Sequence, residues 1–155
     1  MIAKALRVLH LFENLTLAFS FLTMLVLAVM QIALRNFFDG GFLWAESFVR
    51  VLVLWIAILG ALVATRENNH ISIDVMARFL PEIWCKIVSF VVNLIAAAIC
   101  ITVAFYALEF VGYEYQDGTI AFANVPTWIC QSILPIGFGL MGVRFFMNGI
   151  KGLFD

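Results

Sequence analysis

The sequence predicts an all-α membrane protein with four transmembrane helices and one short amphipathic helix on the cytoplasmic surface. Hydrophobic residues make up 65% of the 155 residues and charged residues only 12%, with a mean hydropathy of +1.07. Such usage lies far outside that of soluble domains. Four apolar segments are long enough to span a bilayer, because about 20 helical residues cross its hydrocarbon core. The segments are continuously apolar, whereas the strands of a membrane barrel alternate.

The four predicted spans form a single integral-membrane domain, residues 1–155. They cover approximately residues 15–34, 48–65, 87–108 and 126–143. The first span is expected to be retained, because its apolar stretch exceeds a signal-peptide core and no small-x-small cleavage site follows it. Pro126 fits the first turn of the fourth span, and Pro135 lies inside that span and predicts a kink.

The loop between the second and third spans contains the signal for the short amphipathic helix. Ser72 or Asp74 can cap its first turn, and Pro81 ends it. Its apolar side would face the membrane, so we expect this helix to lie along the cytoplasmic surface.

Lysine and arginine residues fall mostly on one side of the predicted spans. Seven of them lie on the side of the termini: Lys4, Arg7, Arg66, Arg78, Lys86, Arg144 and Lys151. The other side has Arg35 in its first loop and the acidic residues Glu109, Glu114 and Asp117 in its second. Because short cytoplasmic loops carry the excess of positive charge, both termini are predicted to be cytoplasmic.

One face of the second span combines charged and small residues. Steps of three and four residues from Glu46 lead to Arg50, Ala57, Gly60, Ala61 and Ala64. Small residues at this spacing let helix backbones approach closely, so this face should contact protein. The residues alone leave two interpretations open, which are packing within the chain's own bundle and packing against a larger partner.

Three charged residues lie near the beginning of the second span. Glu46 and Arg50 are one helical turn apart, so their side chains can pair. A structural ion pair at the outer interface is favoured over a direct role in moving substrate, and removal of one member of a buried pair would lower complex yield. Arg35 could pair with Asp39 or Glu46, or it could face a periplasmic partner.

The polar segment after the second span contains Arg66, Glu67, His70 and Asp74. A metal site or proton relay at His70 would need more histidine, cysteine or carboxylate groups nearby than the segment supplies. We therefore favour a hydrogen-bonded loop histidine.

Several catalytic classes lack the necessary residues. Membrane cytochromes need pairs of haem-ligating histidines, and His10 and His70 both lie outside the predicted spans. Cys85, Cys100 and Cys130 form no C-x-x-C pair, and no phosphate-binding Gly-Lys-Ser/Thr loop is present. We expect no enzyme activity, no cofactor and no metal site in this chain.

Two function classes fit the remaining features. A small autonomous transporter or channel usually has an essential carboxylate within a span, and the predicted spans contain none. A non-catalytic membrane scaffold needs only small-residue faces and loop charges, so the scaffold is favoured. The alternatives left open are an autonomous multispan transporter or channel and a small membrane enzyme with a polar cluster at residues 66–74.

Two motifs flank the second span and point to a known family. The span begins with Trp44-x-Glu46-x-x-x-Arg50, contains the pair Gly60-Ala61, and ends with Arg66-Glu67-x-x-His70-Ile-x-x-Asp74. A weaker similarity comprises Pro126-Thr-Trp128, Leu134-Pro135-Ile-Gly137-Phe138 and Arg144. This combination resembles the small, four-helix Q-type membrane subunit of tripartite ATP-independent periplasmic (TRAP) transporters, over most of the chain after the first helix.

The resemblance implies a set of partners in the bacterial inner membrane. A periplasmic binding protein would capture an organic acid, such as a C4-dicarboxylate or sialic acid, and deliver it to a large multispan subunit driven by a sodium gradient. The small subunit would act as a scaffold, with sodium bound on the large subunit. The end of the chain at Asp155, soon after the fourth span, implies that the large subunit is a separate chain. Membrane lipids are the other expected contacts, and no nucleic acid is expected.

Overall fold

The computed structural model describes residues 2–38, 41–67 and 82–154. Its long helices are α1 (Ile2–Phe38), α2 (Leu43–Glu67), α4 (Glu82–Asp117) and α6 (Ile133–Phe154). Strands β1 (Ile120–Phe122) and β2 (Val125–Pro126) and helix α5 (Thr127–Gln131) connect α4 to α6. Within the described ranges, four helical segments are long and apolar enough to cross a membrane, which confirms the predicted fold class. The predicted amphipathic helix before Pro81 lies outside the described residues.

The helices extend beyond the predicted spans. Helices α1 and α4 contain 37 and 36 residues. Each is therefore about 55 Å long at 1.5 Å per residue, against about 30 Å for the hydrocarbon core. Such helices must tilt in the bilayer or project from it. The predicted segments 15–34 and 87–108 are only the most apolar parts of these helices, because hydropathy does not mark where a helix continues through a more polar turn.

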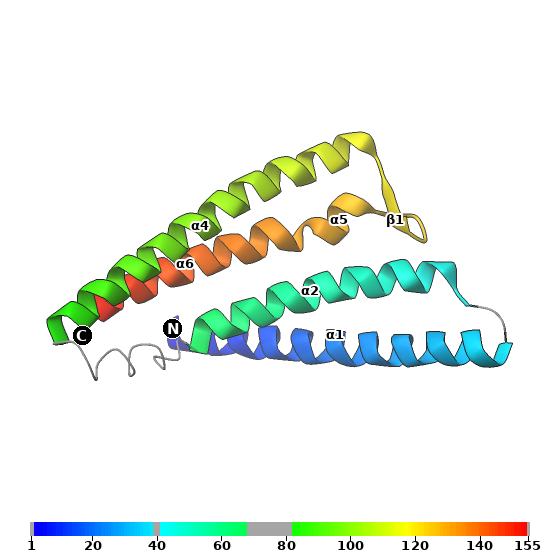
Figure 1. Cartoon of the computed structure of the whole chain (residues 1–155), viewed down its shortest axis with the longest axis horizontal. Helices are drawn as coiled ribbons and strands as arrows, with labels where there is room; N and C mark the ends of the chain where they lie inside the picture. The colour runs from blue at the N-terminus through cyan, green and yellow to red at the C-terminus, as the bar shows by residue number, and fades with distance from the viewer. Residues whose placement is uncertain (1, 39–40, 68–81, 155) are drawn as a thin grey trace.

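The four long helices form an open row in the order α1, α2, α6, α4 (Figure 1). Helix α2 packs between α1 and α6, and α6 packs between α2 and α4. Helix α1 begins and α6 ends at one end of the row, which we call the terminal end. The β1–β2 hairpin and the beginning of α2 lie at the opposite end, which we call the hairpin end.

Glycines on α6 allow close contact with its neighbours. A Cβ atom at Gly142 would lie 2.9 Å from Ile101 Cγ1 and 3.5 Å from the carbonyl oxygen of Ala97, both on α4. A Cβ atom at Gly137 would collide with Ile58 of α2. Close approach of backbones is a common basis of helix packing in membranes, so these glycines let α6 pack closely against both α2 and α4.

The buried core lies between α2 and α6. Its five members are Ile58, Leu59, Leu62, Ile133 and Met141. Leu17 of α1 and Trp55 of α2 pack against this cluster. Trp55 Nε1 also donates a hydrogen bond to the carbonyl oxygen of Cys130, at 2.9 Å, which fixes α5 to α2.

Helices α5 and α6 together form the fourth predicted span, with a break at Ser132. Pro135 lacks the N–H that would bond the carbonyl of Gln131, and its ring crowds that carbonyl. The hydroxyl of Ser132 donates to the carbonyl oxygen of Ile129 at 2.7 Å, which supports the chain at the break. The kink predicted at Pro135 is confirmed, whereas Pro126 is the N-cap residue of α5 and does not lie in its first turn.

The β1–β2 hairpin is an element that the sequence did not predict. Its tip residues, Ala123 and Asn124, have φ angles of 41° and 68°. Two consecutive left-handed residues are typical of the tight turns that join antiparallel strands. Phe122 of β1 contacts Phe48 of α2 with 5.0 Å between ring centroids, so the hairpin bridges α4 and α2.

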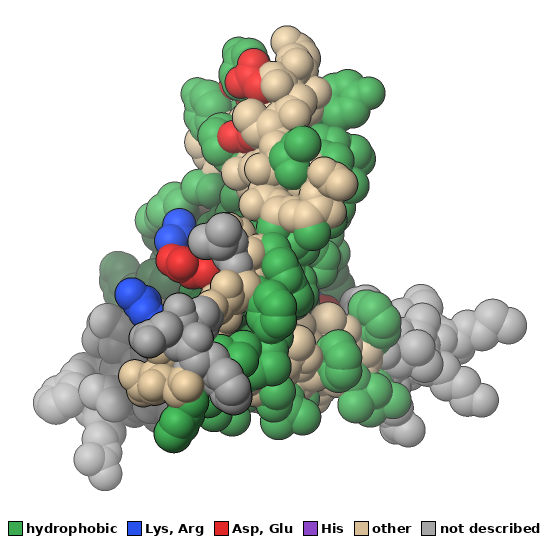
Figure 2. Space-filling model, turned by 90° about the vertical axis from the view of Figure 1, so that its right-hand side faces the viewer, with side chains coloured by type: hydrophobic (Ala, Val, Ile, Leu, Met, Phe, Trp, Pro, Cys, Tyr) green, Lys and Arg blue, Asp and Glu red, His purple; other side chains and the backbone are tan. Residues whose placement is uncertain are grey.

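Many large hydrophobic side chains are exposed on the described surface. On α1 they include Phe12 and Phe19, and on α4 they include Val92, Phe105 and Leu108. Figure 2, which views the hairpin end, shows few charged side chains among many hydrophobic ones. Such a surface suits contact with lipid or with other membrane helices.

Candidate functional site

A buried ion pair joins α1 to α6 towards the terminal end. Arg144 Nη2 donates to Glu13 Oε1 at 2.5 Å, and these side chains are only 16% and 6% exposed. Arg144 Nη1 donates to the carbonyl oxygen of Leu62 at 2.6 Å. One guanidinium group therefore links three helices, α1, α2 and α6.

This pair corrects the expectation that no span contains a carboxylate. Glu13 lies in the apolar segment His10–Phe37, and Arg144 lies in the segment Thr127–Gly152. The expectation was wrong because the helices continue well beyond residues 15 and 143. The signal that could have found the pair is a carboxylate and an arginine, each within a few residues of an apolar run, because such charges need partners in a membrane.

The same contacts cap the end of α2. The Asn148 side chain donates to the carbonyl oxygen of Thr65 at 3.4 Å, and Thr65 Oγ1 donates to that of Leu62 at 2.8 Å. The last carbonyls of a helix lack partners within the helix, and a cation nearby also interacts favourably with the helix dipole. Arg144 and Asn148, one turn apart on α6, supply these donors.

A second ion pair lies at the hairpin end, in the first turns of α2. Arg50 Nη2 donates to Glu46 Oε1 at 2.6 Å, so the pairing predicted from their spacing is confirmed. The two side chains are 76% and 65% exposed, respectively. The pair is therefore not buried within the chain, because the hairpin covers Phe48 but leaves Glu46 and Arg50 exposed.

Arg35 is exposed in the last turn of α1. It forms no ion pair with a described residue, Glu46 included, and Asp39 lies outside the described residues. One turn earlier, Gln31 Nε2 donates to the carbonyl oxygen of Phe42 at 3.0 Å, which ties the end of α1 to the residues that lead into α2. Arg35 is thus an available cation at the hairpin end.

Of the small residues predicted to share a face of α2, some are exposed and one packs against the core. Ala57 and Ala64 are exposed, and a Cβ atom on Gly60 would meet nothing within 4 Å. Ala61 packs against the buried core. We call Ala57, Gly60 and Ala64 the small-residue face, and the described part of the chain leaves it uncovered.

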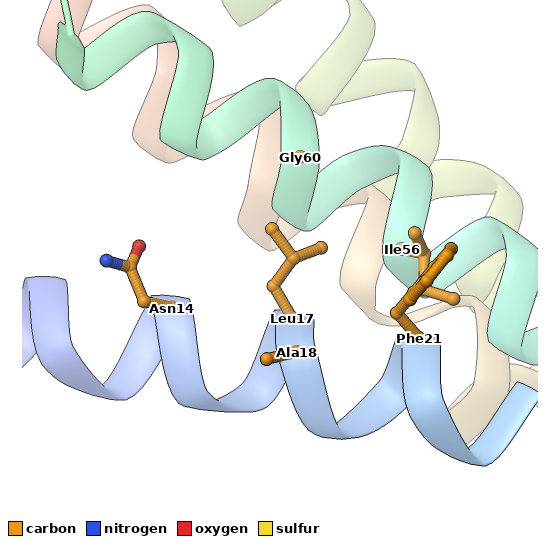
Figure 3. Close-up of a pocket in the computed structure, with 6 residues that line it drawn as sticks. All are labelled: Asn14, Leu17, Ala18, Phe21, Ile56 and Gly60. Carbon is orange, nitrogen blue, oxygen red and sulfur yellow. The ribbon is translucent and has the colours of Figure 1, made fainter.

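A groove of about 480 Å³ lies beside this face, between α1 and α2. Its walls are Asn14, Leu17, Ala18 and Phe21 of α1 and Ile56 and Gly60 of α2. Figure 3 shows Leu17 of α1 pointing towards Gly60 and Phe21 pointing towards Ile56, across the space between the two helices. This groove could not be predicted from local sequence patterns, because it depends on how α1 and α2 pack.

The polar segment after α2 is described only in part. Arg66 and Glu67 form the end of α2, whereas His70 and Asp74 lie outside the described residues. Among the described residues, no three histidine, cysteine or acidic side chains lie close enough to hold a metal ion. All three cysteines are described, and each is a free thiol.

Known proteins similar to this chain are components of TRAP transporters. A Haemophilus influenzae protein named as a TRAP transporter small permease protein is 28% identical over 83% of this chain and 79% of its own length. The ectoine TRAP transporter small permease protein of Halomonas elongata is 24% identical over 91% of this chain and 74% of its own length. Other relatives have sialic acid or C4-dicarboxylate in their names.

One relative contains the matching region within a much longer chain. The isethionate TRAP transporter permease protein of Oleidesulfovibrio alaskensis is 26% identical over 68% of this chain, and the match covers 17% of that protein. This arrangement supports a large permease partner for the small subunit.

The family model of the DctQ component of tripartite ATP-independent periplasmic transporters matches residues 24–154. The match includes the last 15 residues of α1 and every described element after it. Members of this family are transporter components and not enzymes, and their small subunits work with large permease subunits. This chain, with four helices able to span the inner membrane, therefore belongs to the DctQ family of small TRAP transporter subunits.

Proposed function

We propose that this chain is the non-catalytic scaffold subunit of a sodium-driven, binding-protein-dependent transporter for organic acids. It supports a large subunit that binds sodium and carries the substrate. The observation that supports this role best is the small-residue face of α2, which the chain itself leaves uncovered.

The small-residue face suits a protein partner better than lipid. Helix α2 already contacts α1 and α6, and Ala57, Gly60 and Ala64 lie away from the buried core. Lipid supplies no hydrophobic drive for helix association, whereas small residues let a second helix approach closely. Of the two interpretations left open by the sequence, packing against a larger partner is therefore favoured for these three residues. Ala61 instead packs against the core of the chain itself.

The buried charges support a static role. Glu13 and Arg144 are paired with each other between helices of the same chain. A pathway for ions or substrate needs charged groups that can exchange partners, whereas breaking this pair would leave a charge buried in the membrane. The pair therefore holds α1, α2 and α6 together.

The loop charges support the proposed orientation, with both termini in the cytoplasm. Arg144 is buried in an ion pair and no longer counts as a loop cation, and Arg78 lies outside the described residues. The other five predicted cations belong to the parts of the helices at the terminal end, against Arg35 at the hairpin end. The positive-inside rule thus places the terminal end in the cytoplasm and the hairpin end in the periplasm. Labelling of single cysteines at Asp117 and Lys151 with an impermeant reagent tests this, and labelling of Lys151→Cys from the periplasm would contradict it.

The names of the relatives support the proposed substrate class. Isethionate, ectoine, sialic acid and C4-dicarboxylates, which appear in their names, all carry a carboxylate or a sulfonate group. We propose that the transporter served by this chain also carries an organic acid.

The charged residues at the hairpin end suit a periplasmic binding protein. Arg35, Glu46 and Arg50 are all exposed there. Exposed charges at an interface act mainly on the rate of encounter with a soluble partner. Arg35 is the principal docking residue in this proposal, because Arg50 is already paired with Glu46.

Reconstitution into vesicles tests the proposed function. The chain alone is expected to give no organic-acid uptake, and uptake should appear when the large subunit, the binding protein and a sodium gradient are added together. Replacing sodium by potassium should abolish that uptake. Uptake by the chain alone would contradict the scaffold role, and equal uptake without sodium would contradict the driving ion.

A further inference from the structure

The groove between α1 and α2 has two properties that bear on what fills it. It is lined mainly by apolar side chains. The small residues Ala18 on α1 and Gly60 on α2 leave space between its two walls. It also adjoins the small-residue face, because Gly60 belongs to both. The groove and the face therefore form one continuous surface on α1 and α2.

A polar side chain stands in this apolar groove. Asn14 lies within the membrane-spanning segment His10–Phe37, and its amide has no hydrogen-bond partner among the described residues. Lipid acyl chains could fill the apolar part of the groove but can offer no hydrogen bond. A protein helix supplies both apolar contacts and polar groups, and amide side chains commonly bond across membrane helices.

We propose that this groove receives a membrane-spanning helix of the large permease subunit, which forms a hydrogen bond with Asn14. The inference rests on the proposed scaffold function and extends the contact from α2 to α1. The large subunit is the expected occupant because a relative carries the matching region within a longer permease chain. The core side of α2 packs against α6, so the partner meets the side that holds the groove and the small-residue face.

A second groove provides a control within the same helix pair. It measures about 400 Å³ and is lined by α1 and α2 residues that include Val26, Trp44 and Phe48. Val26 lies eight residues after Ala18, so the two positions are about 80° apart around α1. Both side chains are exposed.

Photo-crosslinking in the assembled complex tests the proposal directly. A benzophenone amino acid is placed at Ala18 or at Val26, and the adducts are identified by mass spectrometry. We expect Ala18 to crosslink to the large subunit at least about tenfold more than Val26, since adduct formation requires direct contact with the partner helix. Lipid adducts alone at Ala18, or equal crosslinking at both positions, would overturn the proposal.

Substitutions give a second, independent measurement. Ala18→Phe fills the groove and should lower the yield of complex about tenfold, whereas Val26→Phe should leave it within about twofold. Asn14→Leu removes the hydrogen bond and should weaken the complex about threefold, with Asn14→Gln closer to wild type. Helix content of each isolated chain is measured alongside, so that a folding defect is recognised.

The wild-type complex separates the two proposals. If it transports and the Ala18 variants assemble normally, the groove assignment is wrong and the scaffold function stands. If the wild-type chain does not assemble with a large subunit, the scaffold function itself is wrong.

Discussion

The two ion pairs of this chain differ in almost every property except their chemistry. Glu13 and Arg144 are 131 residues apart in sequence, come from different helices and are nearly buried. Glu46 and Arg50 are four residues apart on one helix and are mostly exposed. The first pair holds three helices together near the terminal end, and the second leaves its charges available at the hairpin end.

The difference separates what the chain needs for its own fold from what it offers to partners. A buried pair that loses one member leaves an uncompensated charge, whereas an exposed pair that loses one member leaves a solvated one. The terminal end is therefore expected to control stability. The hairpin end and the small-residue face of α2 are expected to control interactions with other subunits.

The largest expected effect comes from breaking the buried pair. Glu13→Ala leaves Arg144 without its carboxylate and should destabilise the isolated chain by about 3–5 kcal/mol. Unfolding in mixed micelles, followed by circular dichroism, measures the change. The double variant Glu13→Met with Arg144→Met should be more stable than Glu13→Ala, because no buried charge remains. A Glu13→Ala chain as stable as wild type would show that the pair does not hold the helices together.

A smaller effect is expected from the glycine contacts of α6. Gly142→Val places methyl groups against Ile101 and Ala97 and should cost about 1–3 kcal/mol through overpacking. Gly139→Val is the matched control on the same helix, since a Cβ atom there meets nothing within 4 Å. Equal unfolding curves for the two variants would contradict the close packing of α4 on α6.

The exposed pair should contribute little to the stability of the isolated chain. Glu46→Ala or Arg50→Ala is expected to change its free energy of unfolding by less than about 1 kcal/mol, because solvent screens the exposed charges. The same unfolding assay measures it. A loss of stability as large as that of Glu13→Ala would contradict the claim that only the buried pair stabilises the fold.

The effect of Arg35→Glu on uptake should depend on the concentration of binding protein. Reversal of an exposed docking charge acts on encounter rate, so uptake should fall at low concentrations of binding protein and recover at high ones, with normal assembly. Uptake is measured over a titration of binding protein at low and high salt. Wild-type uptake at every concentration would contradict the docking role, and Lys151→Glu, at the opposite end, is the control.

The sequence could predict features that depend on residues close together along the chain. Four long apolar runs predicted the four helices, and the four-residue spacing of Glu46 and Arg50 predicted their pairing. The restriction at Pro135 predicted the break in the fourth span. Each follows from local geometry or from hydropathy alone.

Features that depend on packing could not be predicted in this way. The contact of Glu13 with Arg144 exists only because α1 and α6 both approach α2. Hydropathy also placed Glu13 outside the first span, since it detects the apolar centre of a helix and not its ends. Similarly, steps of three and four residues from Ala57 led to both Gly60 and Ala61. These consecutive residues lie about 100° apart around the helix, and Ala61 packs against the core.

The most direct test of the account compares Gly60→Leu with Gly112→Leu. Both glycines are helical, and an added Cβ atom meets nothing within 4 Å at either position. We expect both isolated chains to unfold like wild type, while Gly60→Leu alone lowers the yield of complex with the large subunit, by about tenfold or more. Full assembly of the Gly60→Leu chain would contradict the claim that the small-residue face of α2 holds the partner.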